Sequence, residues 1–213
     1  MKNILCYGDS NTFGSIPIEC KRYDINERWT GILQKLLGNE YRIIEEGLGG
    51  RTSVFDDPHK SGRNGLEYIE TAMETHKPLD LVVIALGTND LKTHFSASSN
   101  IIAQGIRRII YRIRTCEDQM KYKKPDILVL APPPLGERVE IVNKFSEFNQ
   151  NSVSISKELA EKYRLLSELE NVHFFDLGTI VKASDEDQIH FSKESHKIIA
   201  EHLAEKIKEI FRK

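Results

Sequence analysis

The chain has 213 residues, enough for one α/β domain with a sizeable core, so we expect a single domain over residues 1–213. A formal net charge of −2 and a pI near 6.4 give no electrostatic reason to expect nucleic acid or an anionic membrane as partner. No apolar segment approaches the ~18 residues of a membrane span, and the amino terminus lacks a signal-peptide pattern, so we expect a cytoplasmic protein. Three cysteines without C-x-x-C spacing indicate neither a disulfide framework nor a zinc site.

Strand patterns alternate with helix patterns along the chain. Five apolar runs predict strands at residues 3–7, 41–46, 80–86, 126–131 and 172–176. Helical periodicity lies at residues 29–37, 65–76, 99–115, 143–169 and 193–211. The runs are rich in Ile, Leu and Val, as is typical of an open parallel sheet covered on both faces. Two long connections, residues 14–28 and 51–65, follow the first two strands, so we expect them to wall a site.

The first strand leads into Gly8-Asp9-Ser10, where glycine permits a tight turn that presents the serine. Taken alone, this pattern also fits a turn whose Ser or Asp caps a helix, or a flavodoxin-like loop that binds a phosphate. It is not the G-x-S-x-G elbow of α/β-hydrolases, because Thr12 stands at the last glycine position. The other motifs must decide between these interpretations.

A carboxylate and a histidine lie close together after the fifth strand, as Asp187 and His190. Histidine titrates near neutral pH and can accept the proton of a serine hydroxyl, while a nearby carboxylate orients its Nδ1. An isolated D-x-x-H pattern also fits a surface turn. Of the other histidines, His196 lies in a helix pattern and is interpreted as structural or solvated, and His59 and His94 stay open as residues of the site wall.

Two further strands are followed by groups that can bind a developing oxyanion. The Gly47-Leu48-Gly49-Gly50 turn can expose backbone N–H groups, and the side-chain amide of Asn89 is a second donor. Thr52 stands where a dinucleotide fingerprint needs its last glycine, so that fingerprint is poorly supported. Asn89 also fits a turn or a helix cap.

Loop carboxylates and histidines raise a metal site as an alternative. The groups concerned are Asp56, Asp57, His59, Asp90 and His94. Neither an H-E-x-x-H nor an EF-hand spacing supports this alternative. We therefore expect no metal and no cofactor.

Taken in order, Ser10, Gly50, Asn89 and His190 resemble the GDSL/SGNH hydrolase family over essentially the whole chain. This resemblance implies a three-layer α/β/α flavodoxin-like fold around a parallel five-stranded sheet, with a serine esterase site at the carboxyl ends of the strands. It implies that Ser10 is the nucleophile of a triad with Asp187 and His190. It further implies an oxyanion hole made by the amides of Ser10 and Gly50 and the Asn89 side chain. Gly50 is chosen over Gly49 because the family's donor commonly lies two residues before a Thr, here Thr52.

Peripheral stretches are similar to the bacterial arylesterase/acyltransferase branch of this family. They are residues 28–31, 46–52, 56–58 and 132–135. This similarity implies small acyl groups, acyl transfer to alcohols in competition with hydrolysis, and homo-oligomers.

The hypothesis from the sequence is a serine esterase that hydrolyses small, acetyl-like esters through an acyl-enzyme. Its partner is a small-molecule ester. Two alternatives stay open: a carbohydrate O-deacetylase with the same chemistry, and a non-catalytic flavodoxin-like protein that binds a phosphate or flavin.

Overall fold

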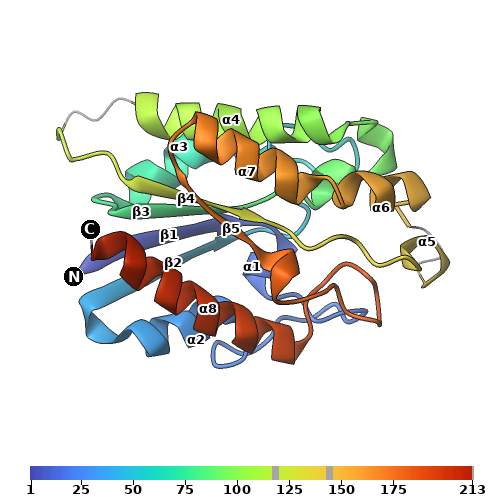
Figure 1. Cartoon of the computed structure of the whole chain (residues 1–213), viewed down its shortest axis with the longest axis horizontal. Coiled ribbons are helices and arrows are strands. Elements are labelled where there is room, and N and C mark those ends of the chain that lie inside the picture. Colours follow the sequence, from blue (N-terminus) through green and yellow to red (C-terminus); the bar gives the residue numbers. More distant parts are fainter. Residues whose placement is uncertain (117–119, 143–145, 213) are drawn as a thin grey trace.

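A parallel sheet forms the middle of the molecule, as a computed structural model of residues 1–116, 120–142 and 146–212 shows (Figure 1). Its strands are β1 (Lys2–Gly8), β2 (Tyr41–Gly47), β3 (Leu81–Ala85), β4 (Asp126–Ala131) and β5 (His173–Asp176). The order is β2-β1-β3-β4-β5, with every neighbouring pair parallel. The direction of winding reverses between β1 and β3, and in open α/β sheets ligands bind at the carboxyl ends of the strands beside such a reversal.

Helices cover both faces of this sheet (Figure 1). On one face lie α3 (Gly65–His76), α4 (Ser99–Thr115) and α7 (Leu159–Leu169), and on the other lie α2 (Trp29–Leu37) and α8 (Lys193–Phe211). The shorter helices are α1 (Ser10–Phe13), α5 (Val139–Val142) and α6 (Gln150–Ser156), with 3-10 turns η1 (Gly38–Glu40), η2 (Asn89–Leu91), η3 (Thr93–Phe95) and η4 (Leu177–Thr179). The expected three-layer α/β/α fold is confirmed. Among the described residues no helix is both long and apolar enough to cross a bilayer.

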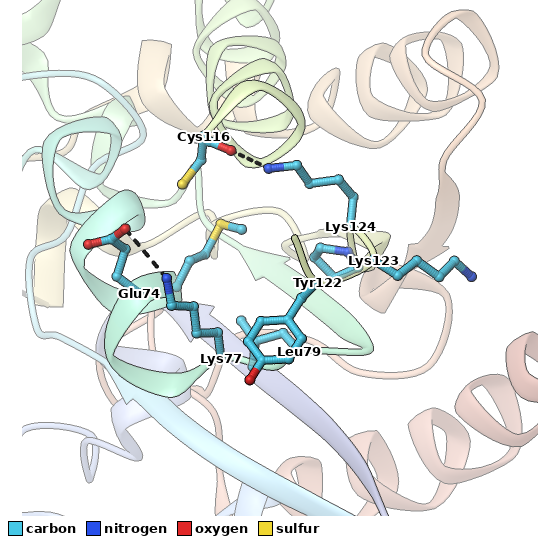
Figure 2. A pocket seen from close by; sticks show the side chains of 9 residues that line it. Glu74, Lys77, Leu79, Cys116, Tyr122, Lys123 and Lys124 are labelled. Atoms are coloured by element: carbon cyan, nitrogen blue, oxygen red, sulfur yellow. Dashed lines mark hydrogen bonds and ion pairs between the residues drawn. The ribbon is translucent and has the colours of Figure 1, made fainter. Parts of the chain in front are cut away.

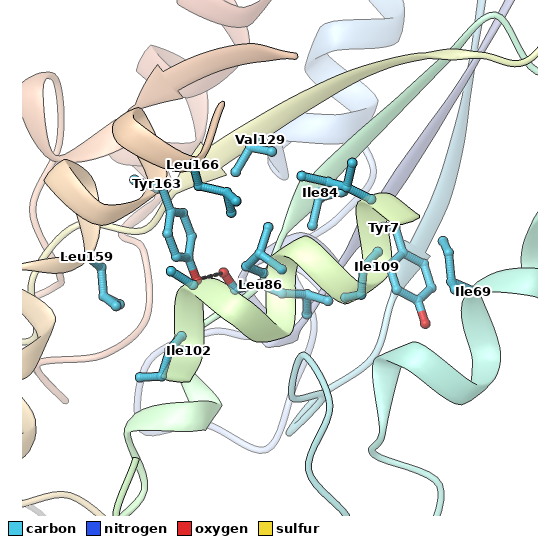
Figure 3. Packing of buried hydrophobic residues seen from close by; sticks show 14 of the residues in the cluster. Tyr7, Ile69, Ile84, Leu86, Ile102, Ile109, Val129, Leu159, Tyr163 and Leu166 are labelled. Atoms are coloured by element: carbon cyan, nitrogen blue, oxygen red, sulfur yellow. Dashed lines mark hydrogen bonds between the residues drawn. The ribbon is translucent and has the colours of Figure 1, made fainter. Parts of the chain in front are cut away.

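Alternation along the strands divides the core into two layers. In β1, Tyr7 faces the α3/α4/α7 layer and Cys6 faces the α2/α8 layer, because successive strand side chains point to opposite faces. Figure 3 shows the first layer, where Tyr163 of α7 donates a hydrogen bond to the Leu86 carbonyl at 3.1 Å. Each fully buried apolar side chain contributes roughly 1.5–3 kcal/mol. The two layers therefore hold the sheet between its helices and fix the carboxyl ends of the strands.

One predicted helix, over residues 143–169, is wrong as a single element. The structure has α6 and α7 instead, and residues 143–145 lie outside the part it describes. Asn149 starts α6 with a capping box: its side chain accepts from the Ser152 N–H, and the Ser152 hydroxyl accepts from the Asn149 N–H. The apolar spacing continues past this cap and past Lys157, so periodicity alone did not reveal either boundary. The other four predicted helices are confirmed over their whole predicted ranges.

Candidate active site

Ser10 opens α1 directly after the carboxyl end of β1. Asp9 caps this short helix by accepting a hydrogen bond from the Asn11 N–H at 2.9 Å. A Cβ on Gly8 would lie within 3 Å of the Thr12 side chain and the Ala85 carbonyl, so this close turn requires glycine. The turn therefore presents the Ser10 hydroxyl at the carboxyl edge of the sheet.

The side chain of His190 bridges Ser10 and Asp187. Its Nε2 lies 2.9 Å from Ser10 Oγ, and its Nδ1 lies 2.6 Å from Asp187 Oδ2. An ionised carboxylate only accepts hydrogen bonds, so Nδ1 carries the proton and Nε2 can accept one from Ser10. Burial would raise the pKa of Asp187, but the hydrogen bond and charge of His190 and the backbone N–H groups hold it at about 2. Such an arrangement can move a proton from a hydroxyl to an imidazole.

The segment that carries His190 is fixed on both sides of the ring. Asp187 Oδ1 accepts the N–H groups of Ile189 and His190 at 2.9 and 2.8 Å. Asn11 accepts from the Phe191 N–H at 3.0 Å and donates to the Ile189 carbonyl at 3.4 Å. Asn11 is buried and was not predicted from the sequence as a site residue. Its position directly after Ser10 was the available signal. Asn11 thus links the turn of Ser10 to the loop of His190.

The glycine turn and Asn89 lie beside Ser10. A Cβ on Gly49 would be 4.0 Å from the Ser10 Cβ, and Gly50 has a φ of +83°, which glycine adopts without strain. Asn89 Nδ2 donates to the Arg51 carbonyl at 3.1 Å, which fixes the amide and leaves its second N–H for another acceptor. Within the described chain, the N–H groups of Gly49 and Gly50 have no protein acceptor.

Two buried carboxyl groups, Asp9 and Asp90, lie beneath these site residues. Asp90 accepts the Ser53 N–H at 3.0 Å and also its hydroxyl, so it ties the loop after the glycine turn to the turn of Asn89. Burial raises the pKa of Asp9 and of Asp90 to about 6, against the opposing effect of their hydrogen bonds. The raised values mark the low polarity of the layer beneath the site.

Lys92 lies inside a cluster that contains Asp57 and His94, two of the side chains weighed as metal ligands in the sequence. Asp57, His94 and Glu147 each bring a ligand atom within 4.8 Å of the others. The Lys92 ammonium, however, lies 2.7 Å from Asp57 and 3.0 Å from Glu147. It therefore neutralises part of the carboxylate charge that would otherwise attract a metal ion. Burial would raise the pKa of Asp57, but the bond from Lys92 lowers it. The remaining metal candidates, Asp56, His59 and Asp90, lie outside this cluster.

A cleft of about 430 Å³ joins these groups, and its lining includes Ser10, Gly49, Gly50, Asn89, Asp187 and His190. Both long loops contribute to it, through Ile16 and Cys20 from residues 14–28 and Lys60 from residues 51–65, as expected. His59 and His94 do not line the cleft, so the structure does not place them in its wall. Three residues that do line the cleft were not predicted from the sequence: Lys92, Glu147 and Phe148.

A second pocket lies at the opposite end of the strands, between Leu79 before β3 and Pro125 before β4 (Figure 2). Its lining includes a Glu74–Lys77 ion pair at 3.7 Å and Lys124, which donates to the Cys116 carbonyl. Burial raises the pKa of the Cys116 thiol, so it is a poor nucleophile near neutral pH. This pocket thus lacks the combination of groups found at Ser10.

Comparison with known proteins places the chain in a family. A family model described as GDSL-like lipase/acylhydrolase matches residues 6–198. The search of curated proteins found no significant match.

Solved structures agree with this family match. The aryl esterase of M. smegmatis is 35% identical, with a TM-score of 0.91 over 98% of this chain and 99% of its own. Est24, a carbohydrate acetylesterase from Sinorhizobium meliloti, is 36% identical, with a TM-score of 0.91 over 99% of this chain and all of its own. A lipase/acylhydrolase from Enterococcus faecalis shares the fold at 19% identity, with a TM-score of 0.70 over 98% of this chain and 96% of its own. The chain therefore belongs to the GDSL-like lipase/acylhydrolase family and is a carboxylic ester hydrolase.

Proposed function

We propose that the protein hydrolyses small-acyl esters, with Ser10 as nucleophile, His190 as general base and Asp187 as the group that orients His190. The observation that carries this proposal is the continuous contact from Asp187 through His190 to Ser10, at 2.6 and 2.9 Å. A serine hydroxyl is a weak nucleophile until a neighbouring base accepts its proton. The contact supplies that base in the required tautomer.

The reaction has two steps. Ser10 Oγ attacks the ester carbonyl carbon while His190 Nε2 takes the hydroxyl proton, and the developing oxyanion lies against the amides of Ser10 and Gly50 and the side chain of Asn89. His190 then protonates the leaving alkoxide as the acyl–oxygen bond breaks. In the second step His190 activates water, which attacks the acyl-enzyme and releases the acid and Ser10. An alcohol in place of water yields a new ester, so the same intermediate allows acyl transfer.

The negative charge of Asp187 beside His190 favours proton transfer from Ser10 to His190 in the first step. The imidazolium that forms donates a charge-assisted hydrogen bond from Nδ1 to the ionised Asp187, whose pKa of about 2 keeps it charged at neutral pH. The steps written above use only Ser10, His190, Asp187 and the oxyanion donors, so they require no redox or phosphate cofactor. We keep the cytoplasmic location and the homo-oligomer as predictions from the sequence.

A labelling experiment tests the assignment of Ser10. We expect the purified protein to cleave 4-nitrophenyl acetate and to react with a fluorophosphonate probe at one site, which mass spectrometry maps to Ser10. The Ser10→Ala variant should lose both properties, with activity reduced by at least about 10⁴-fold. Cleavage that persists in this variant, or a label on another residue, would remove Ser10 from the mechanism.

The similarity to a carbohydrate acetylesterase favours one alternative within the same chemistry, a carbohydrate O-deacetylase. Rates on acetylated sugars and on aryl or alkyl esters of rising chain length distinguish the two. The non-catalytic flavodoxin-like binder from the sequence analysis is disfavoured, because a binder has no use for the His190 base. It would require copurified chromophore or tight nucleotide binding without ester cleavage.

A further inference from the structure

Lys92 is a charged side chain that is almost entirely buried yet lies in the wall of the Ser10 cleft. Only 3% of its side chain is exposed. It follows Asn89 by three residues, at the end of the 3-10 turn η2, and the two residues line the same cleft. A buried ammonium is costly unless other groups compensate it, so its position calls for a reason.

The hydrogen bonds of this ammonium leave one donor without a protein acceptor. A lysine ammonium has three N–H donors. Asp57 Oδ2 accepts one of them at 2.7 Å. Glu147 Oε2 forms an ion pair with the ammonium at 3.0 Å, and the described residues provide no third partner. Asp57 is fully buried and Glu147 partly exposed, so the two carboxylates hold the ammonium from the protein side and from the rim.

The charge around Lys92 selects the kind of acceptor that can use its third N–H. One ammonium facing two carboxylates leaves a net charge of −1 in the group of Lys92, Asp57 and Glu147. A further carboxylate or phosphate would meet repulsion from Glu147, which shares the cleft wall. A neutral hydroxyl or ether oxygen avoids that repulsion and still gains a charge-assisted hydrogen bond.

We propose that Lys92 is a specificity residue that binds a neutral oxygen of the substrate close to the reacting ester. This inference rests on the proposed esterase function and names its substrate class: esters with an additional hydroxyl or ether oxygen a few bonds from the carbonyl. An acetyl group has no such oxygen. With acetyl-like acyl groups the oxygen therefore belongs to the alcohol portion, as in a polyol or sugar acetate.

Two matched substrate pairs test this proposal. The alcohol arm compares glycerol 1-acetate with propyl acetate, and the acyl arm compares phenyl hydroxyacetate with phenyl acetate, all by acid release at constant pH. We expect the wild type to favour glycerol 1-acetate within its pair, and the Lys92→Met variant to lose about tenfold to a hundredfold of that preference. If Lys92→Met loses its preference only in the acyl arm, the hydrogen bond from Lys92 is supported, but the substrate oxygen that accepts it belongs to the acyl group.

Control variants separate recognition from folding. The Lys92→Met change leaves two carboxylates uncompensated, so the Lys92→Met/Asp57→Asn double variant provides the same measurement with one buried charge removed. Lys197→Met, which removes an exposed lysine of α8 outside the cleft, is the matched control and should keep the wild-type preference.

The outcomes distinguish the two proposals. If Lys92→Met, or the double variant where that protein does not fold, lowers kcat/KM equally for both members of each pair, Lys92 only supports the fold and the specificity proposal is overturned. A wild type that cleaves all four esters without preference overturns it too, and leaves the esterase proposal intact. A wild type that cleaves none of them and is not labelled at Ser10 overturns both.

Discussion

The two ends of the sheet both carry a hollow, but the chemistry of their linings differs. At the carboxyl ends, β1 leads to Ser10, β2 to Gly50 and β3 to Asn89, and a late loop brings His190 to the same place. At the amino ends, the pocket of Figure 2 is lined by helix ends and a lysine-rich loop. Parallel strands point all their carboxyl ends to one edge, so the first residues of several crossovers converge there. The comparison teaches that chain direction, and not the presence of a hollow, concentrates reactive groups.

Among the residues around Ser10, the largest effect is expected at Asp187, which we propose orients His190. We expect Asp187→Asn to lower kcat by about 10⁴-fold, because an amide stabilises the wrong tautomer of the ring and does not stabilise the imidazolium. Steady-state kinetics with 4-nitrophenyl acetate measure the loss. Retention of more than a tenth of the activity would contradict the role of Asp187.

A smaller loss is expected at Asn89, the proposed oxyanion donor. Asn89→Ala removes one side-chain N–H from the developing charge and should lower kcat by about 10²–10³-fold with little change in KM, since the bond strengthens in the transition state. A rise in KM at constant kcat would instead assign Asn89 to ground-state binding.

The link between the two halves of the site ranks third. Asn11→Ala removes the contacts to Phe191 and Ile189 on both sides of His190 and should lower kcat by roughly tenfold to a hundredfold, since a small misplacement of a base slows proton transfer. Asn11→Asp is the matched variant, because it keeps the acceptor for the Phe191 N–H. Equal losses in the two variants would show that this acceptor is not what positions the loop.

These residues also show what the sequence predicted and what it did not. The strand patterns predicted that Ser10, Gly50 and Asn89 lie at one edge of the sheet. Each of these residues follows a strand, and the carboxyl ends of parallel strands all lie at the same edge. The pairs formed by Asn11 with Phe191 and by Lys92 with Glu147 depend on how distant loops pack, which periodicity does not encode. The capping box at Asn149 is a local signal, yet a continuing apolar stripe concealed it.

Asp90, one of the two buried acids beneath the site, makes the free energy of unfolding depend on pH. The pKa of Asp90 is raised to about 6, so the folded protein binds a proton more tightly than the unfolded chain, and stability falls as pH rises from about 4 to 6. We expect Asp90→Asn to make this slope shallower, by up to about 1.4 kcal/mol per pH unit. Urea unfolding between pH 4 and pH 7.5 measures the slope, whatever the variant does to absolute stability. An unchanged slope would exclude Asp90 as its source.

The smallest effect is expected at the opposite end of the sheet. The pocket of Figure 2 and the Ser10 site lie at opposite ends of β3, whose five residues span roughly 17 Å. At physiological salt, exposed charges are largely screened over about 8 Å. Glu74→Gln and Lys123→Met remove charges from that pocket and should leave kcat/KM for 4-nitrophenyl acetate within about twofold of the wild type. A tenfold change in either variant would mean that the amino ends of the strands are energetically coupled to Ser10, and chain direction alone would no longer account for where the chemistry lies.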